Sequence, residues 1–169
     1  MANIELLVPK ILKYEGGFVQ DPDDKGGATN MGITLVTFQH VFGPDKTADD
    51  LKKLTVCDFR EIMKIFFWDR WLANQILNQS VAELLVDWVW ASGKWGIIIP
   101  QRIIGVKADD KVGPDTISHL NSMDQPVLHE KIRQARFDFI NNIVKQDPSQ
   151  QKYLHGWSKR ISDYQFEAC

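Results

Sequence analysis

Apolar residues near the start of this chain recur three and four positions apart, which is the spacing of a helix with one buried face. The first such stripe consists of Ile4, Leu7, Val8, Ile11 and Leu12. It runs into Glu15, which Gly16 and Gly17 follow. Because glycine readily takes the left-handed conformation that closes a helix, we expect Glu15 to be the last helical residue.

The same periodicity predicts helices through most of the remaining sequence. Thr34 should cap a helix at 35–42. Thr47 and Thr55 each have an aspartate three residues later, so each should begin a further helix.

Two helices stand out in the second half of the chain. Ser80 and Glu83 have the spacing of a capping box, and the run at 84–93 after them is apolar on nearly all sides, so this helix should be central. A long helix is expected from Pro126 to about Lys145, with Arg136 on its solvated side.

The signal for strands is confined to residues 18–34. Acids and glycines are dense there, around the polar pair Thr29 and Asn30. This composition predicts tight turns and a small hairpin whose bare backbone could approach a ligand. A calcium loop is the competing interpretation, but Lys25 and Gly32 occupy positions where that loop requires oxygen ligands.

Glu15 is the candidate for acid catalysis. The negative end of a helix macrodipole and the apolar neighbours Tyr14 and Phe18 would favour a protonated carboxyl, which is what a glycosidase uses to protonate the leaving oxygen of a sugar–sugar bond. The alternative is a solvated acid at a helix end beside an ordinary surface loop.

A longer pattern surrounds this glutamate. The residues Glu15-Gly16-Gly17-Phe18, Asp21-Pro22, Asp24-Lys25-Gly26-Gly27-Ala28-Thr29-Asn30 and Gly32-Ile33-Thr34 together resemble the signature of the glycosyl hydrolase 108 family. These are bacterial and phage N-acetylmuramidases with a lysozyme-like fold, some of them named secretion activator proteins. The resemblance implies that Glu15 is the catalytic glutamate, and it makes Thr29 and Asn30 candidates for contacts with substrate.

Asp24 is our candidate for the second carboxylate, because it precedes two glycines in the part of the motif that matches best. It would either attack and stabilise the oxocarbenium ion or activate a water, for which carboxyl separations of about 5 to 5.5 Å and about 6.5 to 9.5 Å are typical. We favour the wider arrangement. Asp24 could instead brace the hairpin by accepting backbone N–H bonds.

Two further residues are candidates for substrate contacts. The family has an aromatic pair near Trp71, and tryptophan stacks well on sugar faces, whereas Phe66 and Phe67 more simply fill the core. Asp87 lies inside the apolar helix and must find partners. A structural acid bonded to neighbouring backbone is the simpler interpretation of Asp87. Family members tend to have asparagine where this chain has Ala91, so a substrate contact made by the asparagine amide is not expected here.

The C-terminal part resembles the segment of the family that is described as a predicted peptidoglycan-binding region, on Gln101-Arg102 and 109–116. Asp110 replaces the usual glycine, but aspartate tolerates a left-handed conformation, so the loop should survive. Gly156-Trp157-Ser158-Lys159-Arg160 matches a Gly-Trp-x-x-Arg motif, which either ties down the catalytic region or packs the terminus.

Composition bounds the domain organisation. A chain of 169 residues with 44% hydrophobic residues can bury about 70% of its unfolded surface in one core. We therefore expect one lysozyme-like α+β domain, mostly α, over 1–169, with a catalytic signature region at 1–94 and a helical region at 95–169. The net charge of -2 gives no support for a nucleic-acid partner.

No metal or cofactor is expected. Cys57 and Cys169 form no metal motif, and the four histidines lack metal-ligand spacing. The N-terminus has no readable signal peptide, and no run of apolar residues is long enough to insert stably in a membrane. We expect a protein made in the cytoplasm that acts on the cell wall, in the periplasm or after release, with a holin-type pore as a possible export partner.

These observations predict a peptidoglycan hydrolase that cleaves the β-1,4 bond between N-acetylmuramic acid and N-acetylglucosamine in glycan strands. The alternative is a catalytically silent peptidoglycan-binding or secretion-accessory protein with the same fold.

Overall fold

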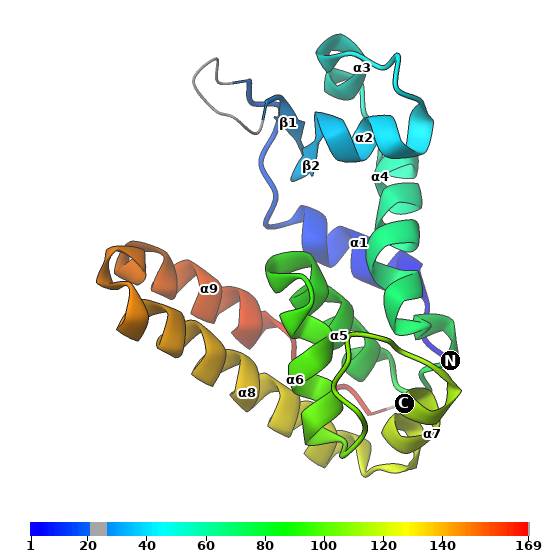
Figure 1. The fold of residues 1–169 in the computed structure, drawn as a ribbon, viewed down its shortest axis with the longest axis vertical. Helices are drawn as coiled ribbons and strands as arrows, with labels where there is room; N and C mark the ends of the chain where they lie inside the picture. The colour runs from blue at the N-terminus through cyan, green and yellow to red at the C-terminus, as the bar shows by residue number, and fades with distance from the viewer. Residues whose placement is uncertain (21–26, 169) are drawn as a thin grey trace. The chain divides into compact units, whose positions relative to one another are not determined.

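The computed structural model describes residues 1–20 and 27–168, and most of them are helical (Figure 1). The longer helices are α1 (Ile4–Leu12), α2 (Leu35–Phe42), α3 (Ala48–Lys52), α4 (Val56–Met63), α5 (Gln79–Ser92), α6 (Trp95–Ile103), α7 (Pro114–Ser122), α8 (Gln125–Gln146) and α9 (Gln151–Asp163). Short π and 3₁₀ turns η1 (Lys64–Trp68), η2 (Asp69–Trp71) and η3 (Ala73–Gln75) follow α4, and η4 (Pro148–Gln150) precedes α9. Strands β1 (Thr29–Asn30) and β2 (Ile33–Thr34) form one small antiparallel sheet, so the α+β, mostly α fold class is confirmed.

The chain forms two compact units, which we describe separately. The N-terminal unit is Ile4–Phe66, and the C-terminal unit is Phe67–Cys169 with Met1–Asn3. The first residues join the second unit because Ala2 N donates to Ile76 O at 2.9 Å. The single-domain boundaries expected from composition stay a prediction.

Local capping bonds set the helix starts of the N-terminal unit. Thr34 caps α2 by accepting from Thr37 N at 3.2 Å. Thr47 and Thr55 form complete capping boxes at α3 and α4, each with the aspartate three residues on. All three predicted starts are therefore confirmed, and each rests on a side chain that satisfies an otherwise unpaired N–H of the first turn.

The predicted hairpin is also present. Thr29 pairs with Thr34 and Asn30 with Ile33, which leaves Met31 and Gly32 as a two-residue turn. Both turn residues have positive φ, 49° and 75°, as a turn that matches the strand twist requires. Glycine adopts this conformation without strain, whereas methionine is strained there.

Helix α5 is the centre of the C-terminal unit, and α6 and α8 pack against it (Figure 1). Its residues from Ser80 to Val89 are all buried, as the apolar run predicted. The capping box at Ser80 and Glu83 is wrong, however. The helix begins earlier, because Asn78 accepts from Val81 N at 3.0 Å and so caps it. Ser80 Oγ accepts from Glu167 N instead.

Gly96 allows α6 to approach α5 closely. A Cβ at this position would lie 2.5 Å from Val89 N and 2.6 Å from the carbonyl carbon of Trp88, both of which are backbone atoms. No side chain fits there unless the two helices separate.

Gly96→Ala should therefore lower the free energy of unfolding by about 2 kcal/mol or more, because the added methyl forces the helix backbones apart. Urea denaturation followed by tryptophan fluorescence measures this, since all six tryptophans lie between residues 68 and 157, inside the C-terminal unit. Gly156→Ala is the matched control. It lies inside α9 with nothing within 4 Å of its Cβ position, so it should be neutral or stabilise by up to about 1 kcal/mol. Equal effects of the two changes would contradict this account.

Gln101 organises the loop between α6 and α7. Its buried side chain accepts from Asp109 N and Asp110 N, both at 3.1 Å, and donates to Lys111 O at 2.9 Å. Asp110 has φ 64°, which confirms that aspartate occupies the left-handed position here. Its carboxylate also accepts from Arg70 Nη2 at 2.7 Å.

No helix in the part of the chain that the structure describes is both long and apolar enough to cross a membrane.

Candidate functional site

Glu15 follows α1 but is not part of it. The helix ends at Leu12, and the chain then tightens, with Tyr14 N donating to Ile11 O at 2.9 Å and Glu15 N to Leu12 O at 3.2 Å. These bonds span three residues, so they satisfy the last carbonyls through 3₁₀-type turns. The prediction that Glu15 is the last helical residue is wrong. So is its left-handed glycine cap, because neither Gly16 nor Gly17 has positive φ.

The chain after Glu15 is fixed to the hairpin. Val19 and Thr29 exchange two backbone hydrogen bonds of 2.8 Å each. Glu15 itself is half-buried. Both sides of this residue are therefore held, by α1 before it and by the pairing with β1 after it.

Asn30 connects the hairpin to α3. Its side chain is only 5% exposed, and Nδ2 donates to Leu51 O at 2.9 Å and to Lys52 O at 3.3 Å. These carbonyls lie at the C-terminal end of α3, where Leu51 O also accepts from Leu54 N at 3.1 Å. Asn30 thus positions the hairpin, while Thr29, its neighbour, stays half-exposed.

Asp24 lies outside the described residues, as do Asp21 and Asp23. In sequence it falls between Val19 and Thr29, which are paired. Its separation from Glu15 stays a prediction.

Trp71 has no exposed surface, and its Nε1 donates to Gly96 O at 3.1 Å. That carbonyl stands four residues before Pro100, which lies inside α6 and has no N–H to offer it. Trp71 therefore satisfies a carbonyl that proline leaves without its helical donor. Phe66 and Phe67, expected in the core, are only half-buried.

Asp87 is fully buried and lies between two arginines. Its Oδ2 accepts from Arg136 Nη2 at 2.9 Å, and its Oδ1 accepts from Arg160 Nη2 at 2.6 Å. Burial alone would raise the pKa of Asp87, but the two guanidinium charges outweigh it and hold this pKa below the ordinary value of 3.8. We call these three side chains the Asp87 cluster.

The Asp87 cluster corrects two predictions. The partners of Asp87 are arginine side chains and not neighbouring backbone. Arg136 is 3% exposed and does not lie on a solvated face. It lies on a buried stripe of α8 with Leu128, Ile132 and Ile140. These residues are four positions apart, and that spacing was the sequence signal for the burial of Arg136.

Arg160 joins α9 to α5 through this cluster. Within the C-terminal unit, the Gly-Trp-x-x-Arg motif therefore fastens the last helix to the central helix. Tyr164, just after α9, is buried as well. Burial first, and then the negative charge of Asp87, raise the pKa of Tyr164, so it stays a neutral phenol.

Residues able to bind a metal do not gather in the described parts of the chain, where no three or more His, Cys, Asp or Glu side chains come together. His129 is buried, and its pKa falls to about 4 because burial and the nearby charge of Arg133 disfavour the imidazolium ion. Cys57 is an exposed thiol, and Cys169 lies outside the described residues.

Comparisons with known proteins agree with this architecture. The sequence profile of glycosyl hydrolase 108 matches residues 8–93, and that of a predicted peptidoglycan domain matches residues 95–162. The structure of SagA from Brucella abortus is similar, with a TM-score of 0.78 and 26% sequence identity over 95% of this chain and 90% of that one. Among curated proteins no significant match was found. The matched segment contains Glu15 and the whole hairpin and spans about half of the chain, which therefore belongs to the glycosyl hydrolase 108 family.

Proposed function

We propose that this protein is an N-acetylmuramidase that hydrolyses the β-1,4 bond between N-acetylmuramic acid and N-acetylglucosamine, with Glu15 as the general acid. Family membership makes it a glycoside hydrolase, and the predicted peptidoglycan domain supports peptidoglycan as the substrate. Beyond this, we propose which bond is cleaved and that Glu15 donates the proton.

The placement of Glu15 is the observation that carries this assignment. A general acid must be held close to the oxygen that it protonates, and its backbone must not drift. Glu15 sits in a hydrogen-bonded turn after α1, and four residues later the chain is paired with β1. Glu15 is a half-buried residue, so it is neither fully exposed to solvent nor part of the core.

In the proposed reaction Glu15 gives its proton to the glycosidic oxygen as the bond to the anomeric carbon breaks. A water then adds to that carbon and loses a proton to a carboxylate, so the net change is addition of one water across the bond. Asp24 is our candidate for the carboxylate that activates this water.

The other candidate residues take different proposed roles. Thr29 is half-exposed on β1, so we assign it a direct substrate contact. The side chains of Asn30, Trp71 and Asp87 are engaged with protein groups, so we assign them positioning roles.

Asp24→Asn tests the second carboxylate. We expect wall hydrolysis to fall at least about 100-fold, because the amide cannot take a proton from water, while the melting temperature stays unchanged. Asp49→Asn is the control, because Asp49 is exposed, and it should leave activity unchanged. Asp58 is not used for this purpose because it caps α4. Full activity in Asp24→Asn would mean that another group assists Glu15.

Digestion of purified peptidoglycan tests the function as a whole. Turbidity should fall, and mass analysis of the reduced fragments should find N-acetylmuramic acid at each new reducing end. N-acetylglucosamine at those ends would reassign the bond. Binding to the wall without any release of fragments would favour a catalytically silent binding protein.

A further inference from the structure

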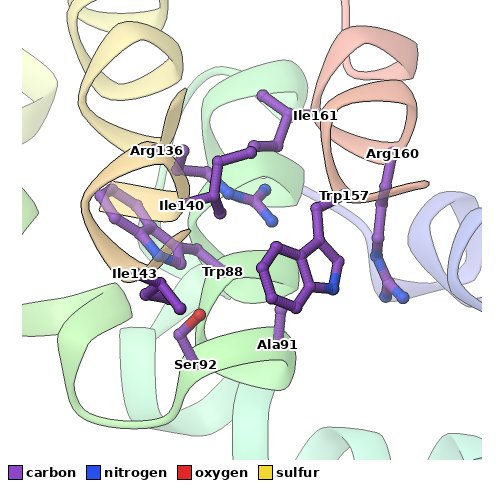
Figure 2. A pocket seen from close by; sticks show the side chains of 9 residues that line it. All are labelled: Trp88, Ala91, Ser92, Arg136, Ile140, Ile143, Trp157, Arg160 and Ile161. Carbon is purple, nitrogen blue, oxygen red and sulfur yellow. The ribbon is translucent and has the colours of Figure 1, made fainter. Parts of the chain in front are cut away.

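We propose that a pocket in the C-terminal unit binds the acetamido group of an N-acetylhexosamine in the wall glycan. The inference rests on the proposed function, because it takes that glycan as the ligand. The pocket lies among α5, α8 and α9, and Figure 2 shows the side chains that form its walls. We call it the α5–α8–α9 pocket.

The size of the pocket selects a substituent and not a whole sugar. Its volume is about 110 Å³. An engineered apolar cavity of about 150 Å³ binds benzene, which has six heavy atoms, so this pocket holds roughly four small heavy atoms. An acetamido group has four, namely two carbons, one oxygen and one nitrogen, whereas a pyranose ring with its hydroxyls is much larger.

The chemistry of the walls fits the same group. Ile140, Ile143 and Ile161 provide aliphatic surface for a methyl group. Ser92, half-buried at the end of α5, provides a hydroxyl that can donate to an amide carbonyl or accept from an amide N–H. Arg136 and Arg160 also line the pocket, and both of their guanidinium groups donate to Asp87. The aliphatic surface and the Ser92 hydroxyl therefore match one methyl and one planar amide.

Trp157 forms one side of the pocket and is itself only half-buried (Figure 2). A tryptophan that is partly inside a pocket and partly outside it can stack on the sugar ring that carries the buried group. Tyr153 holds the indole in place, since their rings stack with centroids 5.7 Å apart and an interplanar angle of 28°. Arg136, which also lines the pocket, is held by Asp87.

The pocket also joins the two matched segments of the chain. Trp88, Ala91 and Ser92 belong to the glycosyl hydrolase 108 match, and the remaining wall residues lie within the predicted peptidoglycan domain. Neither match assigns a ligand position to any of them. The preformed walls favour recognition of a repeated feature of the glycan, and the acetamido group recurs on every sugar of an N-acetylated strand.

The test uses the full chain with Glu15→Gln, so that the ligand is not consumed, and two probes that differ only in acetylation. These are the tetramer of N-acetylglucosamine and its deacetylated counterpart. We expect NMR shifts at the Ala91 and Ser92 amides and at the Trp157 indole N–H with the acetylated tetramer, and none there with the deacetylated one.

Ala91→Leu supplies the variant. Ala91 is exposed at the edge of the pocket, so leucine should fill part of the space without disturbing the core. We expect the Kd of the acetylated tetramer to rise about tenfold or more. Asn142→Leu, exposed on α8 and outside the pocket, is the control and should leave the Kd unchanged.

The inference would be overturned by equal shifts with both tetramers, by no shifts at the three reporter groups, or by equal weakening by Ala91→Leu and Asn142→Leu. Shifts produced only by a peptide of the wall stem would also overturn it. The proposed function is tested separately, by digestion of peptidoglycan with the unaltered chain. If that chain releases fragments while the reporter groups do not respond, only the pocket assignment fails.

Discussion

Glu15→Gln should lower the rate of peptidoglycan hydrolysis by at least about 100- to 10,000-fold, the contribution typical of a general acid. The amide has nearly the same shape as the carboxyl, but it has no acidic proton to give the glycosidic oxygen. Release of soluble fragments from purified walls measures the effect. A variant within a few-fold of the unaltered protein would remove Glu15 from the mechanism.

The fold should survive this change. The hydrogen bonds from Tyr14 N to Ile11 O and from Glu15 N to Leu12 O, which form the turn at Glu15, are made by backbone atoms that the substitution leaves in place. Circular dichroism and the melting temperature should therefore match those of the unaltered protein. Glu61→Gln provides the control, because Glu61 is an exposed glutamate on α4 in the same unit and should keep full activity.

Arg136→Met should cost about 3 kcal/mol of the free energy of unfolding of the C-terminal unit. Removing one partner from a buried ion pair leaves the other charge poorly compensated, and such changes are typically worth 3 to 5 kcal/mol. Arg160 still contacts Asp87 in this variant, so we expect the lower end of that range. Urea denaturation followed by tryptophan fluorescence at neutral pH measures the loss.

The control for this change lies one turn earlier on the same helix. Arg133 pairs with Glu130 at 3.0 Å, but their side chains are 25% and 60% exposed. A solvent-exposed pair of this kind contributes little, so Arg133→Met should change the unfolding free energy by about 0.5 kcal/mol or less. If the two variants had equal free energies of unfolding, the Asp87 cluster would contribute no more to stability than the exposed Arg133–Glu130 pair.

The pH of the measurement matters because Asp87 has a lowered pKa in the folded protein. Its ionised form is favoured by folding, so its contribution to stability is fully present above the unfolded value of about 3.9. That contribution is lost as the pH falls through the lower folded pKa. The difference between Arg136→Met and the unaltered protein should accordingly narrow in strong acid.

Local chemistry allowed several elements to be predicted from sequence. Thr34, Thr47 and Thr55 start helices through bonds to residues three positions later, and these bonds need no distant partner. The turn of the hairpin likewise depends on two adjacent residues, Met31 and Gly32. Such features were predictable because all the interacting atoms lie within one short segment.

The end of α1 shows where local reasoning reached its limit. Gly16 and Gly17 offered an obvious left-handed cap, yet the helix closes earlier through bonds that span three residues. Both endings satisfy the last carbonyls of a helix. The sequence contains no local feature that distinguishes between them.

The motif around Glu15 and the helical character of the chain were determined by the sequence alone, since the one is a fixed order of residues and the other a periodic pattern. The partner of Arg136 and the burial of Trp71 were decided only by the tertiary structure. Asp87 lies 49 residues from Arg136 and 73 from Arg160, and Trp71 meets a carbonyl 25 residues away that Pro100 left without a helical donor. Burying a charged or polar group has a low free-energy cost only where a hydrogen-bonding or oppositely charged partner is present. Folding brings such partners together from distant positions in the sequence, which no local pattern connects.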